Sequence, residues 1–528
     1  MASSPTGPSA NGTKPLLTRD PLARVGPVRS GLTSDGALLL LPSLAILALH
    51  ALTNGQYGFH RDELAVLDDA RHLAWGYVAY PPITPLIARL ALDVAGPSMV
   101  VLRFFSSLSL AIATTLTGLL ARELGGGRRA QIIAAVAVAI APISLLQGAI
   151  FQYVSFDYLW WVLGFYGVIR LLKSENPRWW LFIGAIAGMG METKYTMAFW
   201  VAALAGAVLI TRARRYLASR WLWGGVGIAI LIMLPNLIWQ FQHAFISLEF
   251  LSSIHARDVR IGRTSGFAPE QFVVSTSTFT VPLWIAGLAF FLVSNAGKRF
   301  RALGWIYVLL FGLLFVAPGR SYYLAPAYPV LLAAGSVIWE RWLVAMPTMW
   351  SRVARGVTWG GLAIGGLLSA ALVVPIAPVN SGLWRVTSTV NDTFVEEIGW
   401  PDLVDTVAGI YAALPRDERS GAAILAGNYG EAGAIDLYGP AHGLPPAISG
   451  ADSYWLRGYG DPPPRTIVVL GFSAEEAAGY FTNCSVAGHV ANRYAVANEE
   501  TTYHSDILVC HGTRQPWPAL WPRLRSFN

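Results

Sequence analysis

Two adjacent carboxylates, Asp62 and Glu63, stand in a polar stretch between two long apolar runs. Adjacent residues at the start of a helix point in different directions, so one carboxylate can face a reacting hydroxyl while the other meets a cation or a base. A partly desolvated carboxylate at a membrane edge suits general-base catalysis. The alternative is structural, because Asp62 can cap the following helix and Glu63 can complement its dipole. The two roles do not exclude each other.

The polar stretch around this pair predicts an interfacial helix from Glu63 to Tyr77. Its apolar face is formed by Val66, Leu67, Ala70, Leu73, Ala74 and Tyr77. The polar side chains that project elsewhere are Asp68, Asp69 and His72. Prolines then predict an extended segment, and aromatic residues are expected to anchor the loop at headgroup depth. These residues are Pro81, Pro82 and Pro85, and Trp75, Tyr77 and Tyr80.

The composition indicates an integral membrane protein. The chain has 528 residues, of which 54% are hydrophobic and 13% charged, and its mean hydropathy is +0.47, whereas soluble domains carry about 25% charged residues. The net charge is +7, but the basic residues form short clusters between apolar runs. That distribution is typical of membrane orientation, and we expect no nucleic-acid partner.

About eleven apolar runs approach the ~20 residues that cross a bilayer. They lie at about 37–53, 98–120, 129–147, 155–172, 179–193, 195–211, 221–240, 272–294, 302–317, 323–343 and 356–377. With the N-terminus inside, every second loop is basic, as the positive-inside rule requires. The residues of these inner loops are Arg122, Arg128 and Arg129; Lys173 and Arg178; Arg212, Arg214, Arg215 and Arg220; Lys298, Arg299 and Arg301; and Arg341, Arg352 and Arg355. An odd number of spans places the C-terminal part outside.

The chain is therefore predicted to be a mainly α membrane protein of three parts. Residues 1–36 are expected to form a disordered cytoplasmic tail, residues 37–379 the transmembrane domain, and residues 380–528 an extracytoplasmic α/β domain. In the last part, strand-like runs at 422–425 and 466–470 follow a helix-like stretch near 402–414. Cys484 and Cys510 both lie there. They form a disulfide if this part is exported, or remain two unpaired small hydrophobic residues.

The pattern FHRDEL…ARHLAWGYV..PP, which begins at Phe59, resembles glycosyltransferase family 39. This family includes the dolichyl-phosphate-mannose-protein mannosyltransferase-like bacterial membrane enzymes of the GT-C fold. Further similar pieces are Thr193-Lys194-Tyr195, Leu234-Pro235-Asn236 with Trp239-Gln240, Arg320 to Pro326 with Tyr328-Pro329, Asn428 to Ala432, and Ser453-Tyr454-Trp455. The resemblance covers most of the chain and implies a GT-C-type helical bundle.

The resemblance also implies a reaction and a set of partners. Such enzymes transfer a sugar, with inversion, from a polyprenyl-phosphate carrier in the membrane to a hydroxyl acceptor on the outer side. The acceptor is a protein, a lipid or a polysaccharide. A polyprenyl-phosphate-sugar donor, membrane lipids and such an acceptor are therefore the expected partners, in the cytoplasmic (plasma) membrane with the active site outside.

Individual roles follow from the same resemblance. Asp62 is expected to be the general base on the acceptor hydroxyl, with Glu63 supporting it or orienting the acceptor. Asp157 matches a second acidic residue in the next outer loop, although it could equally cap the following helix. Cationic donors should meet the leaving phosphate. For this role we expect Lys194 first, whose alternative is simple snorkelling, and then Arg320 and Tyr323.

The chain departs from one branch of the family, and other interpretations stay open. In the branch that adds aminoarabinose to lipid A, a phosphate-contacting lysine precedes the Pro-Pro pair; Tyr80 stands here, preceded by Ala79. Asp62, Glu63 and Asp157 could together bind a divalent cation, Mg or Mn, through oxygen ligands, but no ligand spacing requires it. The alternatives are a transporter or flippase of a lipid-linked sugar, and an accessory subunit whose C-terminal domain only binds a glycan or a partner.

Overall fold

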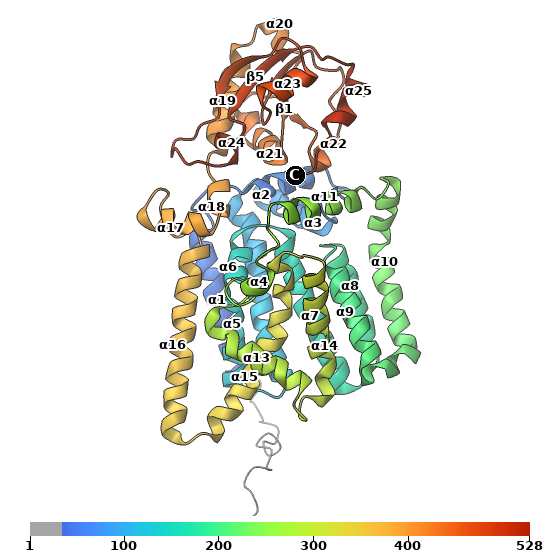
Figure 1. Ribbon diagram of the computed structural model, residues 1–528, viewed down its shortest axis with the longest axis vertical. Coiled ribbons are helices and arrows are strands. Elements are labelled where there is room, and N and C mark those ends of the chain that lie inside the picture. Colours follow the sequence, from blue (N-terminus) through green and yellow to red (C-terminus); the bar gives the residue numbers. More distant parts are fainter. Residues whose placement is uncertain (1–33) are drawn as a thin grey trace, which may run out of the picture.

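The computed structural model describes residues 34–528, so the predicted tail at 1–36 lies almost wholly outside the described residues. A bundle of long helices forms one half of the molecule, and a smaller domain containing a β-sheet stands on one end of it (Figure 1). Three helices lie between these parts: α2 (Arg61–Arg71), α3 (Ile83–Ala95) and α11 (Ile246–Arg260).

The predicted apolar runs correspond to helices or bent helix pairs, except that the run at 272–294 becomes helical only from Thr278. By length and composition, five helices could cross a membrane, or up to seven if each bent pair is one span. The pair α5 and α6 bends by 62°, and Pro142 begins α6 because proline cannot continue the preceding helix. The helices of the bundle are α1 (Ser34–Thr53), α4 (Met99–Glu123), α5 (Arg128–Ala139), α6 (Pro142–Ala149), α7 (Tyr153–Ser174), α8 (Trp179–Met191), α9 (Met197–Ile210), α10 (Arg220–Gln242), α13 (Val281–Leu292), α14 (Arg301–Val316), α15 (Tyr328–Ala345) and α16 (Thr348–Val373).

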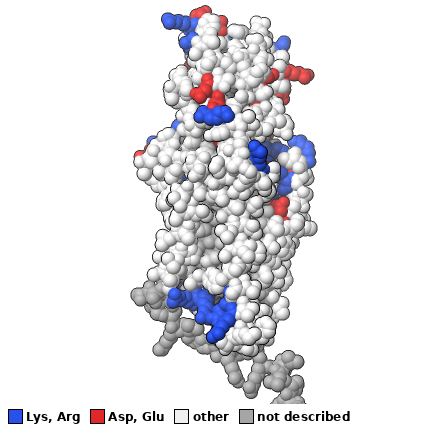
Figure 2. All heavy atoms as spheres, turned by 90° about the vertical axis from the view of Figure 1, so that its left-hand side faces the viewer, with Lys and Arg blue, Asp and Glu red and all other residues white. Residues whose placement is uncertain are grey.

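The basic turns of the bundle meet at one end. Glu175, after α7, forms ion pairs with Arg215 and Arg299 from two other turns, at 3.4 and 3.5 Å. Glu340, near the end of α15, accepts a hydrogen bond of 2.6 Å from the backbone of Gly127, before α5. Figure 2 shows a cluster of Lys and Arg at the end of the bundle opposite the sheet domain. The loops predicted to be basic therefore contribute to one end of the bundle.

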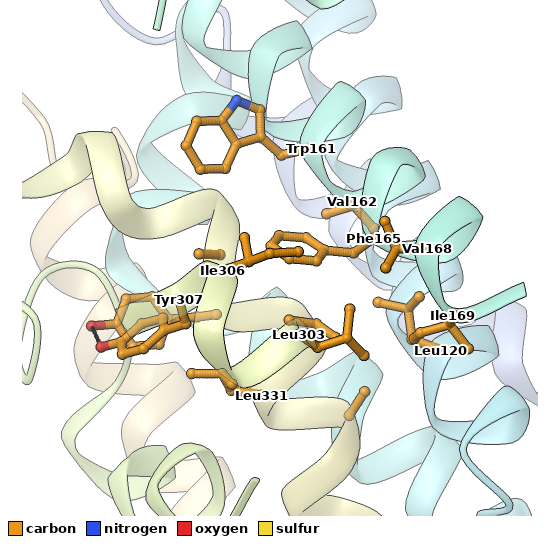
Figure 3. Packing of buried hydrophobic residues seen from close by; sticks show 14 of the residues in the cluster. Leu120, Trp161, Val162, Phe165, Val168, Ile169, Leu303, Ile306, Tyr307 and Leu331 are labelled. Carbon is orange, nitrogen blue, oxygen red and sulfur yellow. Dashed lines mark hydrogen bonds between the residues drawn. The ribbon is translucent and has the colours of Figure 1, made fainter. Parts of the chain in front are cut away.

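The bundle core is apolar and closely packed. Trp161 and Phe165 of α7 face Leu303 and Ile306 of α14 (Figure 3), and these side chains are fully buried. Helices α13 and α15 approach closely at Gly335, where an added Cβ would lie 1.8 Å from the carbonyl oxygen of Leu283. Small residues at such contacts let membrane helices pack backbone to backbone. In contrast, α10 and α16 are mostly exposed, as expected for helices that face lipid.

The first outer loop differs from the prediction in three ways. Helix α2 ends at Arg71 rather than Tyr77, and a second helix, α3, begins directly after Pro82 and contains Pro85, where an extended segment was predicted. Tyr77 and Tyr80 are buried, not at headgroup depth, whereas Trp75 is exposed. Helix α2 also lies beneath α21 (Tyr429–Tyr438) of the sheet domain. Periodicity along one helix could not reveal this second packing partner.

The second packing partner also explains why Asp68 and Asp69 are buried rather than projecting to solvent. Both carboxylates pair with Arg457 of the sheet domain, with 2.5 Å between Asp69 Oδ1 and the Arg457 guanidinium. Tyr80 donates a hydrogen bond of 2.7 Å to Asp69 Oδ2. The polar face of α2 is thus a docking face, because its charges are matched by a partner from residues far along the chain.

The C-terminal domain is α/β, as predicted. A five-stranded sheet has the order β2-β1-β3-β5-β4; β1 pairs in parallel with β2 and β3, and β5 is antiparallel to β3 and β4. The strands are β1 (Ala422–Ala426), β2 (Ala447–Ser449), β3 (Thr466–Val469), β4 (Ser485–His489) and β5 (Asp506–His511). Helix α19 (Trp400–Ala413) packs beside it. Of the two alternatives for the cysteines, the structure has the disulfide, Cys484–Cys510.

We predict that removing the disulfide destabilises this domain. The bridge joins positions 26 residues apart, and cross-links of this kind typically contribute about 2–4 kcal/mol by restricting the unfolded chain. A double Cys484→Ala, Cys510→Ala variant should therefore unfold at lower temperature in detergent, and dithiothreitol should lower the transition of the wild type equally. Reductant should leave the variant unchanged. Equal transitions for both proteins would contradict the prediction.

Candidate functional site

A cavity of about 850 Å³ lies between the helical bundle and the sheet domain. Its walls come from the first outer loop, the turns after α6, α8 and α14, the segment 250–263, and α21 and α22 (Asp452–Trp455). Four of the six predicted site residues line it: Asp62, Lys194, Arg320 and Tyr323. Glu63 and Asp157 do not line it. The tertiary fold thus collects side chains that are widely separated in the chain.

Asp62 lies in the first turn of α2 and faces the cavity. His60 caps the helix by accepting a hydrogen bond of 3.2 Å from the Asp62 backbone. The carboxylate itself accepts 2.7 Å from the Tyr429 hydroxyl and 2.6 Å from Gln152 Nε2. With 31% of its side chain exposed, it is held by two donors and still open to the cavity. Asp62 does not cap the helix with its side chain. The capping role that was the alternative for Asp62 is taken by His60.

Glu63 is fully buried and bound on every side. Arg103 of α4 donates to both of its oxygens, at 2.8 and 2.7 Å. The backbone of Phe151, just after α6, donates 2.8 Å to Oε1, and the backbone of His60 donates 2.8 Å to Oε2. Glu63 therefore cannot contact an acceptor in the cavity directly. The arrangement fits the supporting role predicted for it, because it fixes the turn that presents Asp62.

A third charge completes the group around Arg103. Glu397, between α18 (Thr393–Glu396) and α19, has its carboxylate 3.5 Å from the Arg103 guanidinium, and its carbonyl accepts 3.1 Å from the backbone of Gly58. Burial raises the pKa of Glu397 to about 7, although Arg103 opposes this shift and Glu63 adds to it. One buried cation thus serves two carboxylates from the first outer loop and from the C-terminal segment.

Lys194 reaches the cavity from the turn between α8 and α9 and lies among aromatic rings. Its Nζ is 4.5 Å from the centre of the Tyr323 ring, 5.1 Å from Tyr322 and 5.2 Å from Tyr153. Burial lowers the pKa of Lys194, while Tyr322 and Asp157 raise it. The ammonium is not snorkelling into bulk water, since the residue is 8% exposed. Cation–π contacts hold it with three donors left for an anion.

Asp157 lies below this lysine and is buried. It accepts 2.8 Å from Thr196 Oγ1 and 3.1 Å from Trp161 Nε1. Its side chain neither lines the cavity nor caps α7, for which the structure has no side-chain cap. Asp157 is a counter-charge behind Lys194 rather than a second group in the cavity.

The remaining cations differ in how far they are neutralised. Arg320 is held by Asp258 of α11 through two hydrogen bonds of 2.6 and 2.8 Å. Arg257, one residue before Asp258, lines the cavity, and its Nε lacks a hydrogen-bond partner within the described chain. Arg263 lines the same wall. Arg320 is neutralised by Asp258, so the positive charge on this side of the cavity comes from Arg257 and Arg263.

The carboxylates proposed as a metal site are not brought together. Asp62 faces the cavity, Glu63 is bound to Arg103, and Asp157 is bound to Thr196 and Trp161. Within residues 34–528, no three His, Cys, Asp or Glu side chains are arranged to hold a metal ion. This trio does not fit a divalent cation, because two of its members already have other partners.

Several cavity residues had no predicted role. Tyr429 and Ser453 belong to motifs that carried the family resemblance, and Tyr153 stands four residues before Asp157. Asp452 immediately precedes one of these motifs. The signal that could have identified Tyr429 and Ser453 was their place in motifs that resemble the family. Nothing in the sequence indicated that residues near 429 and 452 meet residues near 62.

Comparison with known proteins bears on the family and the fold. Residues 79–239 match the model of the family described as dolichyl-phosphate-mannose-protein mannosyltransferase. The fold is similar to that of ArnT from Cupriavidus metallidurans bound to undecaprenyl phosphate, with a TM-score of 0.56 and 14% identity over 91% of this chain and 98% of that one. The apo form of the same protein gives a TM-score of 0.54 and 14% identity, over 90% and 97%. No curated protein matches significantly in sequence.

These findings confirm the resemblance to family 39 membrane glycosyltransferases. The family match covers less than half of the chain, and the likeness to ArnT shows the fold alone at this level of identity. The fold class is likewise confirmed as a GT-C-type helical bundle with a small C-terminal sheet domain.

We predict that Arg103→Met is strongly destabilising. It would leave Glu63 and Glu397 buried without their cation, and breaking a buried ion pair costs about 3–5 kcal/mol. The matched control is Arg89→Met, since Arg89 pairs with Asp93 on the surface at 3.0 Å and exposed pairs contribute little. Thermal unfolding in detergent should separate the two variants clearly. Equal unfolding temperatures would contradict the structural role assigned to Arg103.

We also predict that Glu397 makes the stability of the fold depend on pH. A carboxyl group whose pKa is raised on folding, here from 4.5 to about 7, contributes stability below pH 4.5 that is lost as the pH rises through 7. Glu397→Gln imitates the protonated group. Its unfolding temperature should exceed that of the wild type at pH 8.5, by about 2 °C or more, and the difference should shrink at pH 5. A variant less stable than the wild type at pH 8.5 would contradict this.

Proposed function

We propose that the protein transfers a sugar, with inversion, from a polyprenyl-phosphate-linked donor to a hydroxyl acceptor. The observation that carries the proposal is the shared cavity, in which a carboxylate, Asp62, and an ammonium group, Lys194, both line one space of about 850 Å³. A base for the acceptor and a cation for the leaving phosphate are the two groups that this reaction needs. The donor sugar is a hexose or a pentose.

Asp62 acts as the general base in this proposal. Its carboxylate accepts the proton of the acceptor hydroxyl while the hydroxyl oxygen forms a bond to the anomeric carbon of the donor. The bond from that carbon to the phosphate oxygen breaks on the opposite face, and the electron pair leaves with polyprenyl phosphate. Tyr429 and Gln152 hold the carboxylate in place, so that little reorganisation is needed during the reaction. His60, its helix cap, fixes the backbone beneath it.

Lys194 receives the leaving phosphate. An ammonium group held by aromatic rings and shielded from bulk water interacts with an anion far more strongly than an exposed one. Arg257 and Arg263 supply further donors from the α11 side of the cavity, while Arg320 positions the neighbouring Tyr322 and Tyr323. The ArnT structure contains undecaprenyl phosphate, which supports a polyprenyl-phosphate donor for this chain as well.

The cavity is proposed to open on the outer side of the cytoplasmic membrane. The basic end of the bundle would lie inside, in accordance with the positive-inside rule, and the C-terminal domain and cavity would lie outside. A disulfide in that domain agrees with an oxidising compartment. The donor carrier would remain in the membrane, with its phosphate at the level of Lys194.

Two variants separate the two halves of the mechanism. Asp62→Asn should lower transfer at least ~100-fold, measured with polyprenyl-phosphate sugars, and still bind undecaprenyl phosphate as tightly as the wild type. Lys194→Met should weaken undecaprenyl phosphate binding by about tenfold or more. Isothermal titration of the protein in nanodiscs measures this binding.

The outcomes distinguish catalysis from transport. Loss of turnover with binding preserved in Asp62→Asn excludes a flippase that moves the donor without chemistry. Full transfer activity in Asp62→Asn would overturn the assignment of the base. Unchanged undecaprenyl phosphate binding in Lys194→Met would remove that lysine from the donor site.

A further inference from the structure

Asp452 is a cavity residue that the reaction described above does not use. It begins the short helix α22 in the C-terminal domain and is 8% exposed, and what remains accessible faces the cavity. Among the described residues, the one hydrogen bond to its carboxylate is long, 3.4 Å from the backbone of Asn528 to Oδ1. Within residues 34–528, the other carboxylate oxygen has no hydrogen-bond partner. Since Asp452 lines the cavity, this oxygen is available to accept a hydrogen bond from a ligand there.

The backbone around Asp452 is held rigidly in place. The φ angle of Asp452 is 45°, in the left-handed region that few residues other than glycine, Asn and Asp adopt. Its backbone N–H donates 3.1 Å to Ser526, and the next residue, Ser453, accepts 3.2 Å from the backbone of Val78 in the first outer loop. The carboxyl group is therefore presented to the cavity by a fixed turn, as binding groups are when they are preorganised.

Charged groups of both signs act on Asp452. Burial raises the pKa of Asp452, and the charges of Asp69 and Asp62 raise it further, while Arg257 opposes them. Hydrogen bonds link Asp452 to the Asp62 side of the cavity: Asn528, whose backbone donates to Asp452 Oδ1, also donates 3.4 Å from its Nδ2 to the carbonyl of Gly427. Gly427 lies two residues before Tyr429, which donates to Asp62. A group in this position meets the acceptor rather than the anionic phosphate of the donor.

We propose that Asp452 binds the acceptor, and that the acceptor is a carbohydrate. This inference rests on the function proposed above. The carboxyl group of Asp452 would bind hydroxyls adjacent to the one that Asp62 deprotonates. A carboxyl group has two oxygens and suits neighbouring hydroxyls, which are present on a sugar ring. A Ser or Thr acceptor in a protein has a single hydroxyl and so lacks the pair of adjacent hydroxyls that a sugar ring offers to the two oxygens.

A binding experiment tests this without turnover. The full chain in nanodiscs is titrated with methyl α-mannopyranoside, methyl β-glucopyranoside and methyl α-arabinofuranoside, and separately with N-acetylthreonine methylamide, using saturation-transfer NMR. We expect the wild type to bind at least one glycoside, and Asp452→Asn to weaken that binding by about tenfold. Asparagine keeps the shape of the side chain and tolerates the left-handed backbone, so the turn should be retained.

Two controls accompany the titration. Asp405→Asn alters an exposed carboxylate of the same domain, paired with His442 at 3.3 Å, and should bind the glycoside like the wild type. Undecaprenyl phosphate should bind Asp452→Asn as it binds the wild type. Glycoside binding is measured without a donor and without turnover. The result can therefore be interpreted even if the Asp62 experiment shows that the protein does not transfer sugar.

Three outcomes would overturn the inference. One is unchanged glycoside affinity in Asp452→Asn, and another is the absence of glycoside binding by the wild type. The third is binding of the threonine amide in place of every glycoside, which would indicate a protein acceptor. A selective loss of glycoside binding in Asp452→Asn, with both controls intact, would establish the carbohydrate subsite.

Discussion

The geometry of the site depends on one buried ion pair, between Glu63 and Arg103. Arg103 also donates to the backbone carbonyls of Asn54 and Gly58, at 3.0 and 2.9 Å, and Glu63 accepts from the backbone of Phe151. The pair thus fastens the end of α1, the start of α2 and the turn after α6 to one point on α4. Buried charges are tolerated when every hydrogen-bonding position is filled, and this one is nearly saturated. Asp62 directly precedes Glu63 in the chain, so the ion pair also fixes the position of Asp62.

Around the cavity, most charges are neutralised in pairs. Arg320 is matched by Asp258, and His60 by Glu396 at 2.9 Å. Within the described chain, Lys194 contacts aromatic rings rather than a carboxylate, and Asp452 has little hydrogen bonding. The groups left for a ligand therefore include the cations Lys194, Arg257 and Arg263 and the carboxyl groups of Asp62 and Asp452. Such a combination suits a substrate pair in which one member is an anion and the other a hydroxyl compound.

The C-terminal domain is part of the site rather than an appendage. Arg457 pairs with Asp68 and Asp69 on α2, and Tyr429 donates directly to Asp62. These contacts join the C-terminal domain to α2, which lies between that domain and the helical bundle (Figure 1). If the domain moved away, Asp62 would lose one of its two donors and the cavity one of its walls. Docking of the domain on α2 and positioning of the Asp62 carboxylate thus depend on the same contacts.

Sequence patterns determined the elements and much of the chemistry. Apolar runs of bilayer length predicted the helices of the bundle, because a helix in lipid must be apolar along its whole length. The strands at 422–426 and 466–469 followed from their apolar, β-prone residues and flanking turns. The resemblance brought Asp62 and Lys194 forward, and the structure places both in one cavity. Their roles in the reaction remain proposals.

Only the tertiary structure decided what each charged side chain meets. Periodicity placed Asp68 and Asp69 on a polar face but could not show that Arg457, almost 400 residues away, would cover it. Glu63 and Asp157 are carboxylates, as catalytic groups often are, but they do not line the cavity. Glu63 is bound to Arg103, and Asp157 is bound to Thr196. Asp452 carried no signal of its own. The reason is physical: the function of a carboxylate is set by its burial and by its neighbours, and both are properties of the folded chain.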